Sequence, residues 1–204
     1  MIPATGGLRS LGFVETRDLS RGVVIADAMV KTAPVRLVLL APVSGGRMLV
    51  AVDGDVASVE AAVERAVALA ACKLVDALFI ADLHPGVPEA LRAGRTRTPV
   101  AALGLVETST CAAAVRAADA ALKAAAVRLL RLRLAQGIGG KGFLQLGGEV
   151  ADVEAGVAAA RAAVEHEEFL VATEVIAAPH ADLRAWLGRD LAGDALPADP
   201  PPEA

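Results

Sequence analysis

The chain has very few aromatic residues: 4 Phe, 1 Trp and no Tyr in 204 residues. It also lacks a strong charge of either sign, because 20 basic residues stand against 24 acidic ones. Nucleic-acid binding proteins usually combine a basic surface with aromatic side chains that stack on bases. The composition therefore argues against a nucleic-acid partner. It predicts instead a core of closely packed small aliphatic side chains, in a chain that is 55% hydrophobic.

Segments that would direct the chain to a membrane are also missing from the sequence. Met1 leads into a stretch containing Pro and Gly, whereas a secretory signal begins with a charged region followed by an apolar run. No apolar run is long enough to cross a bilayer. We therefore expect a cytosolic protein with no membrane partner.

Cysteine is scarce as well. Cys72 and Cys111 lie far apart without a CxxC spacing, so the sequence supports neither a disulfide framework nor a zinc site. Each is expected to be a buried free thiol. We expect no metal and no cofactor.

What the sequence does contain is a long internal repeat. LGFVET at 11–16 recurs as LGLVET at 103–108, and ADAMVKTAPVRL at 26–37 recurs as ADAALKAAAVRL at 118–129, both at an offset of 92 residues. GDVASVE at 54–60 recurs as GEVADVE after an offset of 94. A period of this length has the size of a small domain rather than of a solenoid unit. The chain is therefore a tandem duplication.

Each repeat predicts the same order of elements. The helix after the first strand begins near Ser20, a plausible N-cap, and ends at about Ala33, because Pro34 cannot continue it. Strands are expected at 10–16, 35–43, 48–52 and 74–81, then 102–108, 127–134, 143–147 and 169–176; helices are expected at 20–33, 56–71, 110–125 and 149–165. This β-α-β-β-α-β order predicts an α/β fold of the α+β, ferredoxin-like class.

The domain limits follow from composition. We expect a first domain over 8–94, a linker rich in Gly, Pro, Thr and Arg near 91–100, and a second domain over 100–190. Residues 191–204 include three consecutive prolines and predict a disordered tail. A sheet of this class has helices on one face only, so its other face needs cover from tandem or oligomeric packing.

The ordered motifs, each present twice, resemble a known family. They are LGFVET and LGLVET, DAMVK and DAALK, GDVASVE and GEVADVE, IADLHP and IAAPH, together with the GIGGK loop at 137–141. This set resembles the bacterial microcompartment shell domain in its tandem, trimer-forming branch. The resemblance implies a pseudohexameric homotrimer that tiles with hexameric and pentameric shell proteins into the wall of a cytoplasmic protein organelle.

The resemblance also implies contacts at the edge of the tile. Lys31 and Lys123 occupy the same place near a helix end, where a cation is favourable against the helix dipole in any case. His84 and His180 are further edge candidates, with structural capping as the equal alternative. The family often has an Arg just before a Pro-His pair, whereas Ala178 stands there in the second repeat.

A central pore for small metabolites is the second implied site. Its lining would come from one loop in each repeat, and adjacent glycines there permit positive φ; the plain alternative is a hairpin turn that needs glycine. The loop residues are Ser44, Gly45, Gly46, Arg47, Gly137, Ile138, Gly139, Gly140 and Lys141. Some tandem members carry a cysteine in the first loop, where three copies hold an iron–sulfur cluster. Ser44 stands at that place here, and a hydroxyl is a poor cluster ligand.

Two other classes of function, an enzyme and a ligand-binding regulator, are alternatives to a shell protein. For an enzyme, no acid–base pair can be assigned, and the GIGGK loop fails the phosphate-loop pattern because Gly142 follows Lys141 where Ser or Thr is required. We therefore expect no catalytic activity. The alternative is a ferredoxin-like trimeric regulatory protein that binds a small ligand between subunits. Lateral assembly distinguishes the two, because such a regulator would stop at the trimer.

Overall fold

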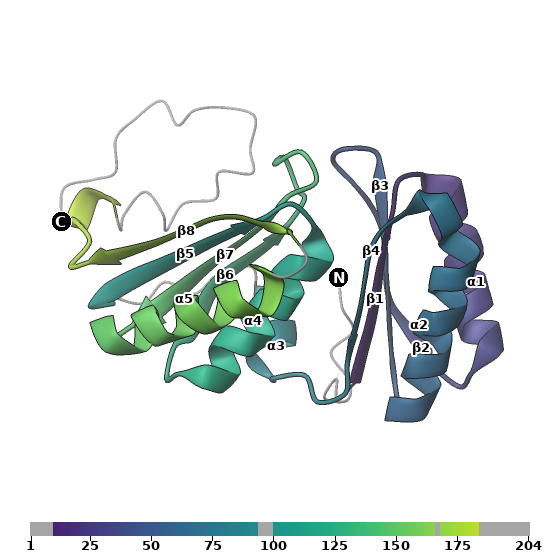
Figure 1. The fold of residues 1–204 in the computed structure, drawn as a ribbon, viewed down its shortest axis with the longest axis horizontal. Coiled ribbons are helices and arrows are strands. Elements are labelled where there is room, and N and C mark those ends of the chain that lie inside the picture. The colour runs from purple at the N-terminus through teal and green to yellow at the C-terminus, as the bar shows by residue number, and fades with distance from the viewer. Residues whose placement is uncertain (1–9, 94–99, 166–167, 184–204) are drawn as a thin grey trace.

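The computed structural model describes residues 10–93, 100–165 and 168–183 and consists of two α/β units in tandem (Figure 1). The first unit comprises β1 (Ser10–Thr16), α1 (Leu19–Thr32), β2 (Arg36–Val43), β3 (Arg47–Gly54), α2 (Val56–Ala70), the 3₁₀ turn η1 (Ala71–Lys73) and β4 (Leu74–Ile80). After α3 (Gly86–Ala93), the second unit comprises β5 (Ala102–Thr108), α4 (Cys111–Ala124), β6 (Arg128–Leu134), β7 (Gly142–Gly148), α5 (Val150–Glu165) and β8 (Leu170–Ala177). The predicted β-α-β-β-α-β order is confirmed in both repeats.

The two sheets have matching topology. Their strand orders are β2-β3-β1-β4 and β6-β7-β5-β8, and every described pair is antiparallel. Even the irregularities correspond: the register of β2 shifts between Leu37 and Leu39, and that of β6 between Leu129 and Arg131. The 92-residue offset found in the sequence is therefore an offset between superposable positions.

The starts of the helices differ slightly from the prediction. Helix α1 begins at Leu19, and its N-cap is Asp18 rather than Ser20, because the Asp18 carboxylate accepts the Arg21 amide N–H at 3.0 Å. The equivalent cap of α4 is the Thr110 hydroxyl, which accepts the Ala113 amide N–H at 3.2 Å. Both side chains satisfy an otherwise unpaired amide in the first turn of the helix.

Helix α3 was not predicted, and its last residues, 91–93, fall within the segment expected to be a linker. Its buried residues Val87 and Ala90 belong to a core shared by both repeats, and the helix packs against α4 and β6. The connection between the repeats is therefore partly a structural element. The rest of the expected linker up to residue 99 and the expected tail at 191–204 lie outside the described residues.

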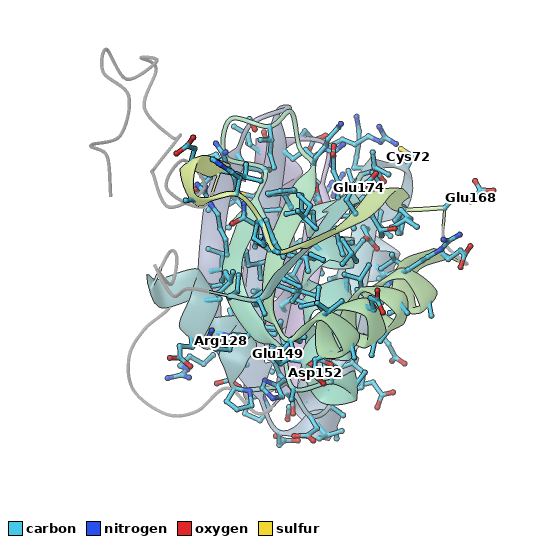
Figure 2. The ribbon with its side chains drawn as sticks, turned by 90° about the vertical axis from the view of Figure 1, so that its left-hand side faces the viewer. Cys72, Arg128, Glu149, Asp152, Glu168 and Glu174 are labelled. Atoms are coloured by element: carbon cyan, nitrogen blue, oxygen red, sulfur yellow. The ribbon has the colours of Figure 1, made fainter. Side chains whose placement is uncertain are left out.

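The two cysteines are free, as expected, but only Cys111 is buried. The prediction of a buried thiol is wrong for Cys72, which lies in η1 at the surface (Figure 2). A one-turn 3₁₀ helix between α2 and β4 has little surface to bury, so its middle side chain faces solvent. Within the described ranges, no helix is long and apolar enough to span a membrane.

The first sheet is covered on both faces. One face carries α1 and α2 of its own repeat, with Val14, Val50 and Val52 in the core between them. Its other face, here called the outer face, presents Phe13 and Leu78 to the second repeat, where they share a core with the residues of α4. In Figure 1 α4 lies beside β4 and β1, on the side away from α1 and α2. This packing gives the first sheet the cover that the sequence required from a tandem partner.

Candidate functional site

The two glycine-rich loops lie next to each other within one chain. A Cβ atom placed on Gly45 would lie 3.3 Å from the carbonyl oxygen of Gly139. The glycines with positive φ, as the sequence predicted for these loops, are Gly45, Gly46, Gly137, Gly139 and Gly140. Ile138 and Lys141 complete the second loop, in which the Lys141 amide donates to the Ile138 carbonyl at 3.3 Å. The Ser44 hydroxyl is buried without a hydrogen-bond partner among the described residues.

Arg47 joins the first loop to the second repeat. Its guanidinium Nη1 donates to Glu15 Oε1 at 2.7 Å and to the carbonyl oxygens of Gly140 at 2.9 Å and Ser109 at 3.2 Å. The other oxygen of Glu15 accepts the Cys111 amide N–H, at the start of α4, at 2.8 Å. One ion pair therefore connects β1, the first loop, the second loop and the N-terminus of α4.

Glu15 itself is completely buried. Loss of solvent raises the pKa of its carboxyl above the ordinary value, and the hydrogen bonds from Arg47 and from the Cys111 amide oppose that rise. Burial also raises the pKa of the Cys111 thiol, which is therefore neutral and unreactive. Glu15 is not among the site residues predicted from the sequence. The available signal was a carboxylate inside the apolar segment LGFVET, repeated at the same place as Glu107.

The second repeat contains the equivalent ion pair in a more open setting. Lys141 Nζ lies 2.5 Å from Glu107 Oε1, and the two side chains are 48% and 31% exposed. Arg47 and Glu15 are 22% and 0% exposed in the first repeat. The difference arises because α4 covers the first pair, whereas no element of the described chain occupies the same place over the second.

The residues expected at the tile edge divide into two groups. Lys123 and His84 are brought together by Asp119, whose carboxylate accepts the His84 amide N–H at 2.7 Å and the Lys123 ammonium at 2.6 Å. Lys123 also donates to the Asp82 carbonyl. Asp119 was not predicted as a site residue, although it lies within the repeated ADA motif. This cluster lies where α4 meets the first repeat.

Lys31 and His180 are not brought together in the single chain. Lys31 pairs with Asp27 on the surface of α1, and His180 lies near Asp182. The imidazole Nδ1 of His84 accepts the Gly86 amide at 3.1 Å, which agrees with the capping alternative at the start of α3. No group of three or more His, Cys, Asp or Glu within the described ranges is arranged to hold a metal ion.

A third polar cluster joins β4 to α4. The Thr110 hydroxyl donates to Asp76 Oδ2 at 2.6 Å. Arg116 donates from Nη2 to the Ala77 carbonyl at 3.3 Å, and the same nitrogen lies 3.9 Å from Asp76 Oδ1. Together with Glu15 and Asp119, these groups line the contact between the outer face of the first sheet and α4. We call this contact the repeat seam.

Comparison with known proteins identifies the repeats. The model of the BMC domain matches residues 10–83 and again residues 102–179. The chain belongs to the BMC-domain family. Because both repeats match, it is a tandem-domain BMC protein, and the two matched segments coincide with the two sheets and their helices.

The relatives of this BMC protein include shell proteins of both single-domain and double-domain length. It is 35% identical to the bacterial microcompartment shell protein PduT of Citrobacter freundii over 172 residues, which cover 84% of this chain and 94% of PduT. It is 45% identical to the carboxysome shell protein CsoS1A of Hydrogenovibrio crunogenus over 74 residues, or 36% of this chain and 76% of that protein.

Solved structures agree with this assignment. A microcompartment protein from Desulfitobacterium hafniense is 39% identical, with a TM-score of 0.75 over 87% of this chain and 98% of that one. A fused permuted hexameric shell protein from the RMM microcompartment is 23% identical, with a TM-score of 0.59 over 76% of this chain and 81% of that one, and supports the fold alone. The tandem BMC architecture is thus shared with known shell proteins.

Proposed function

We propose that this chain is a structural component of a bacterial microcompartment shell, in the cytoplasm. Three copies would form a pseudohexagonal tile that assembles with hexameric and pentameric shell proteins. The observation that carries the proposal is the presence of two complete BMC domains whose glycine loops lie side by side. In this role the chain is a structural part of the shell wall and does not catalyse a reaction. None of the relatives named above is a ligand-binding regulator, so no observation favours that alternative.

The glycine loops are the proposed lining of a central pore. Arg47 is neutralised by Glu15, and Lys141 is paired with Glu107, so neither cation offers an uncompensated charge. The remaining donors are backbone amides of the two loops. Such a lining favours small polar metabolites over apolar ones, because polar donors replace part of their hydration. The two loops differ in length, so a ring of three chains would have three-fold rather than six-fold symmetry.

The proposed lateral edge includes Lys31 and Lys123. It also includes His84 and His180, which occupy equivalent positions in the two repeats. The Lys31 side chain is 72% exposed and that of Lys123 is 40% exposed, so both ammonium groups are accessible to a neighbouring tile. Lys31 pairs with Asp27 across an exposed turn of α1, and such a pair contributes little to stability. Lys123 pairs with the buried Asp119 and also donates to the Asp82 carbonyl. Lys31→Ala should therefore affect lateral contacts more than folding, whereas Lys123→Ala also removes contacts at the repeat seam.

The test combines light scattering with negative-stain microscopy of the purified protein. The wild type is expected to be a trimer that forms flat hexagonal sheets. The double variant Lys31→Ala/Lys123→Ala is expected to remain trimeric and to lose the sheets. Arg161→Ala is the matched control, because Arg161 also forms an exposed i,i+4 pair, with Glu165 on α5. A wild-type protein that remains monomeric at every concentration would contradict the tile.

A further inference from the structure

Arg133 lies near the end of β6, beside the second glycine loop. Its guanidinium Nε donates to the carbonyl oxygen of Gln136 in that loop at 2.7 Å. A Cβ atom placed on Gly137 would lie 3.2 Å from Nη2 of the same side chain. In Figure 1 the loop that joins β6 to β7 projects beyond the ends of these strands, next to the loop that joins β2 to β3. The half-buried arginine therefore lies along a loop that is proposed to line the pore.

This arginine differs from the other two cations of the glycine loops. Arg47 pairs with Glu15. Lys141 pairs with Glu107. Within the described ranges, no Asp or Glu forms an ion pair with Arg133, and its one bonded acceptor is a carbonyl oxygen. Because a carbonyl group carries no net charge, the positive charge of Arg133 is not compensated by that part of the chain.

Most hydrogen-bond donors of Arg133 also remain available. A guanidinium has five N–H groups, and the bond to Gln136 uses the one on Nε. Nη1 and Nη2 donate to no acceptor among the residues that the structure describes. Their N–H groups form a planar fork that matches the two oxygens of a carboxylate or phosphate group. The side chain therefore has both the charge and the geometry to bind an oxyanion.

The backbone of the loop adds further donors. Gly137 and Gly139 are exposed and have φ values of 69° and 66°. Neither amide N–H has an acceptor in the described part of the chain. No atom lies within 4 Å of the place that a Cβ atom on Gly139 would take, so a small solute can reach this backbone. Successive amides in a turn conformation form concavities that bind anions.

We propose that Arg133, together with the amide N–H groups of Gly137 and Gly139, is a binding site for a small oxyanion, either a carboxylate or a phosphate group. This inference rests on the proposed function and deepens it by naming the class of metabolite. Three copies would place three such sites beside the pore. The pore would then admit metabolites that carry a carboxylate or phosphate in preference to cationic ones, as rings of charge do in channels.

The first repeat shows that the strand does not need an arginine at this place. The position equivalent to Arg133 on β2 is Ala41, which pairs with Leu49 as Arg133 pairs with Phe143. An alanine thus occupies the same register position in a sheet of the same topology. Anchoring one carbonyl of the loop uses one donor of Arg133, so the remaining donors and the charge call for a ligand.

The experiment measures binding of inorganic phosphate and of acetate to the purified full chain, by isothermal titration calorimetry at constant ionic strength. The wild type is expected to bind at least one of the two anions saturably, with one site per chain. Arg133→Gln is expected to raise the dissociation constant at least tenfold. Arg133→Lys keeps the charge without the planar fork and should bind between the two. Arg128→Gln is the matched control, because it removes the same charge from the other end of β6, and it should bind like the wild type.

A second pair of variants tests the loop without changing the charge. Gly137→Ala adds a Cβ atom close to Nη2 at a positive φ, so it should displace the fork of Arg133 and weaken binding. Gly46→Ala is its control, because Gly46 has a similar φ of 68° with open space beside it in the first loop. Gly46→Ala should bind like the wild type. Thermal unfolding of each variant confirms that it is folded.

The outcomes separate the anion site from the tile. Equal binding by the wild type and Arg133→Gln would overturn the site. So would equal weakening by Arg133→Gln and Arg128→Gln, because the attraction would then come from the overall charge of the chain. Light scattering of the same samples reports the tile independently. A trimer that binds neither anion would overturn this inference alone, whereas a monomer that binds phosphate through Arg133 would overturn the tile alone.

Discussion

At the scale of single residues, the most informative side chain is a carboxylate within an apolar strand. Glu15 is buried, yet both of its oxygens have partners: Arg47 on one side and the amide of Cys111 on the other. A buried charge is tolerated only where such partners replace its hydration. The duplication made the contrast with Glu107 visible, but the sequence alone did not show which of the two acidic residues was covered.

Removal of this carboxylate should destabilise the chain. Glu15→Ala leaves the Arg47 guanidinium and the Cys111 amide without their acceptor, so we expect the free energy of unfolding to fall by about 3 kcal/mol. Chemical denaturation monitored by circular dichroism measures the change. Glu107→Ala is the control at the equivalent, partly exposed position, where the loss should stay below about 1 kcal/mol under conditions that keep the chain monomeric. Equal losses at the two positions would contradict the role given to burial.

The same residue predicts a pH dependence. Because burial raises the pKa of Glu15, the folded protein keeps this proton to a higher pH than the unfolded chain does. The contribution of this group to stability is therefore fully present below the unfolded pKa of about 4.5 and declines as the pH rises through the folded pKa. Glu15→Gln should remove that decline. Denaturation midpoints of the two proteins, measured between pH 4 and pH 8, should converge or cross as the pH rises; parallel curves would contradict it.

At the scale of elements, hydrophobic pattern and repetition predicted every strand and four of the five α-helices bounded within the described residues. Helix α3 was missed because Gly86 and Pro88 suggest a turn. The elements that stabilise α3, namely α4 and β6, lie in the second repeat, so the local sequence pattern does not indicate them. The N-cap of α1 was displaced by two residues for a similar reason, since Asp18 and Ser20 are equally good caps in sequence.

The loops offer a prediction at the same scale. Gly140 has a φ of 88°, and a Cβ atom there would lie 2.8 Å from Cζ of Arg47. Gly140→Ala should therefore destabilise the chain by about 2 kcal/mol, through backbone strain and displacement of Arg47. Gly46→Ala isolates the strain alone, because Gly46 has a φ of 68° with open space beside it, and should cost about 1 kcal/mol. Thermal unfolding of both variants measures the two losses of stability. A greater loss for Gly46→Ala than for Gly140→Ala would contradict the prediction.

At the scale of the whole molecule, the two repeats share the largest hydrophobic core. The cluster that contains Phe13 and Leu78 of the first sheet also contains Cys111, Val115 and the buried residues of α3. The sequence predicted that the outer face would need cover. The sequence did not predict that α4 of the second repeat supplies this cover, because a pattern of buried positions does not indicate which element packs against them. The tile edge and the pore remain predictions.

A shared core predicts cooperative unfolding of the two repeats. Phe13 is almost completely buried in the repeat seam, so Phe13→Ala should lower stability by about 3 kcal/mol. The variant should still unfold in one calorimetric transition, because loosening the seam exposes both repeats at once. Ile25→Ala, in the separate core under α1 and α2, is the comparison and should lower the same single transition. Two transitions in the wild type would show that the repeats unfold independently.

The repeat seam joins two domains that are not identical, and this has a genetic consequence. In a ring built from six identical domains, one substitution alters six contacts together, so a residue must suit both of its roles at once. Fusion removes that constraint: in the proposed ring, a change at Asp76 touches three contacts and leaves the other three untouched. Asp76 and Arg116 form a charged contact in the repeat seam, whereas the equivalent positions of the other repeats hold the apolar residues Ala172 and Val24. The duplicated gene could hold both pairs of residues because each half no longer had to recognise itself.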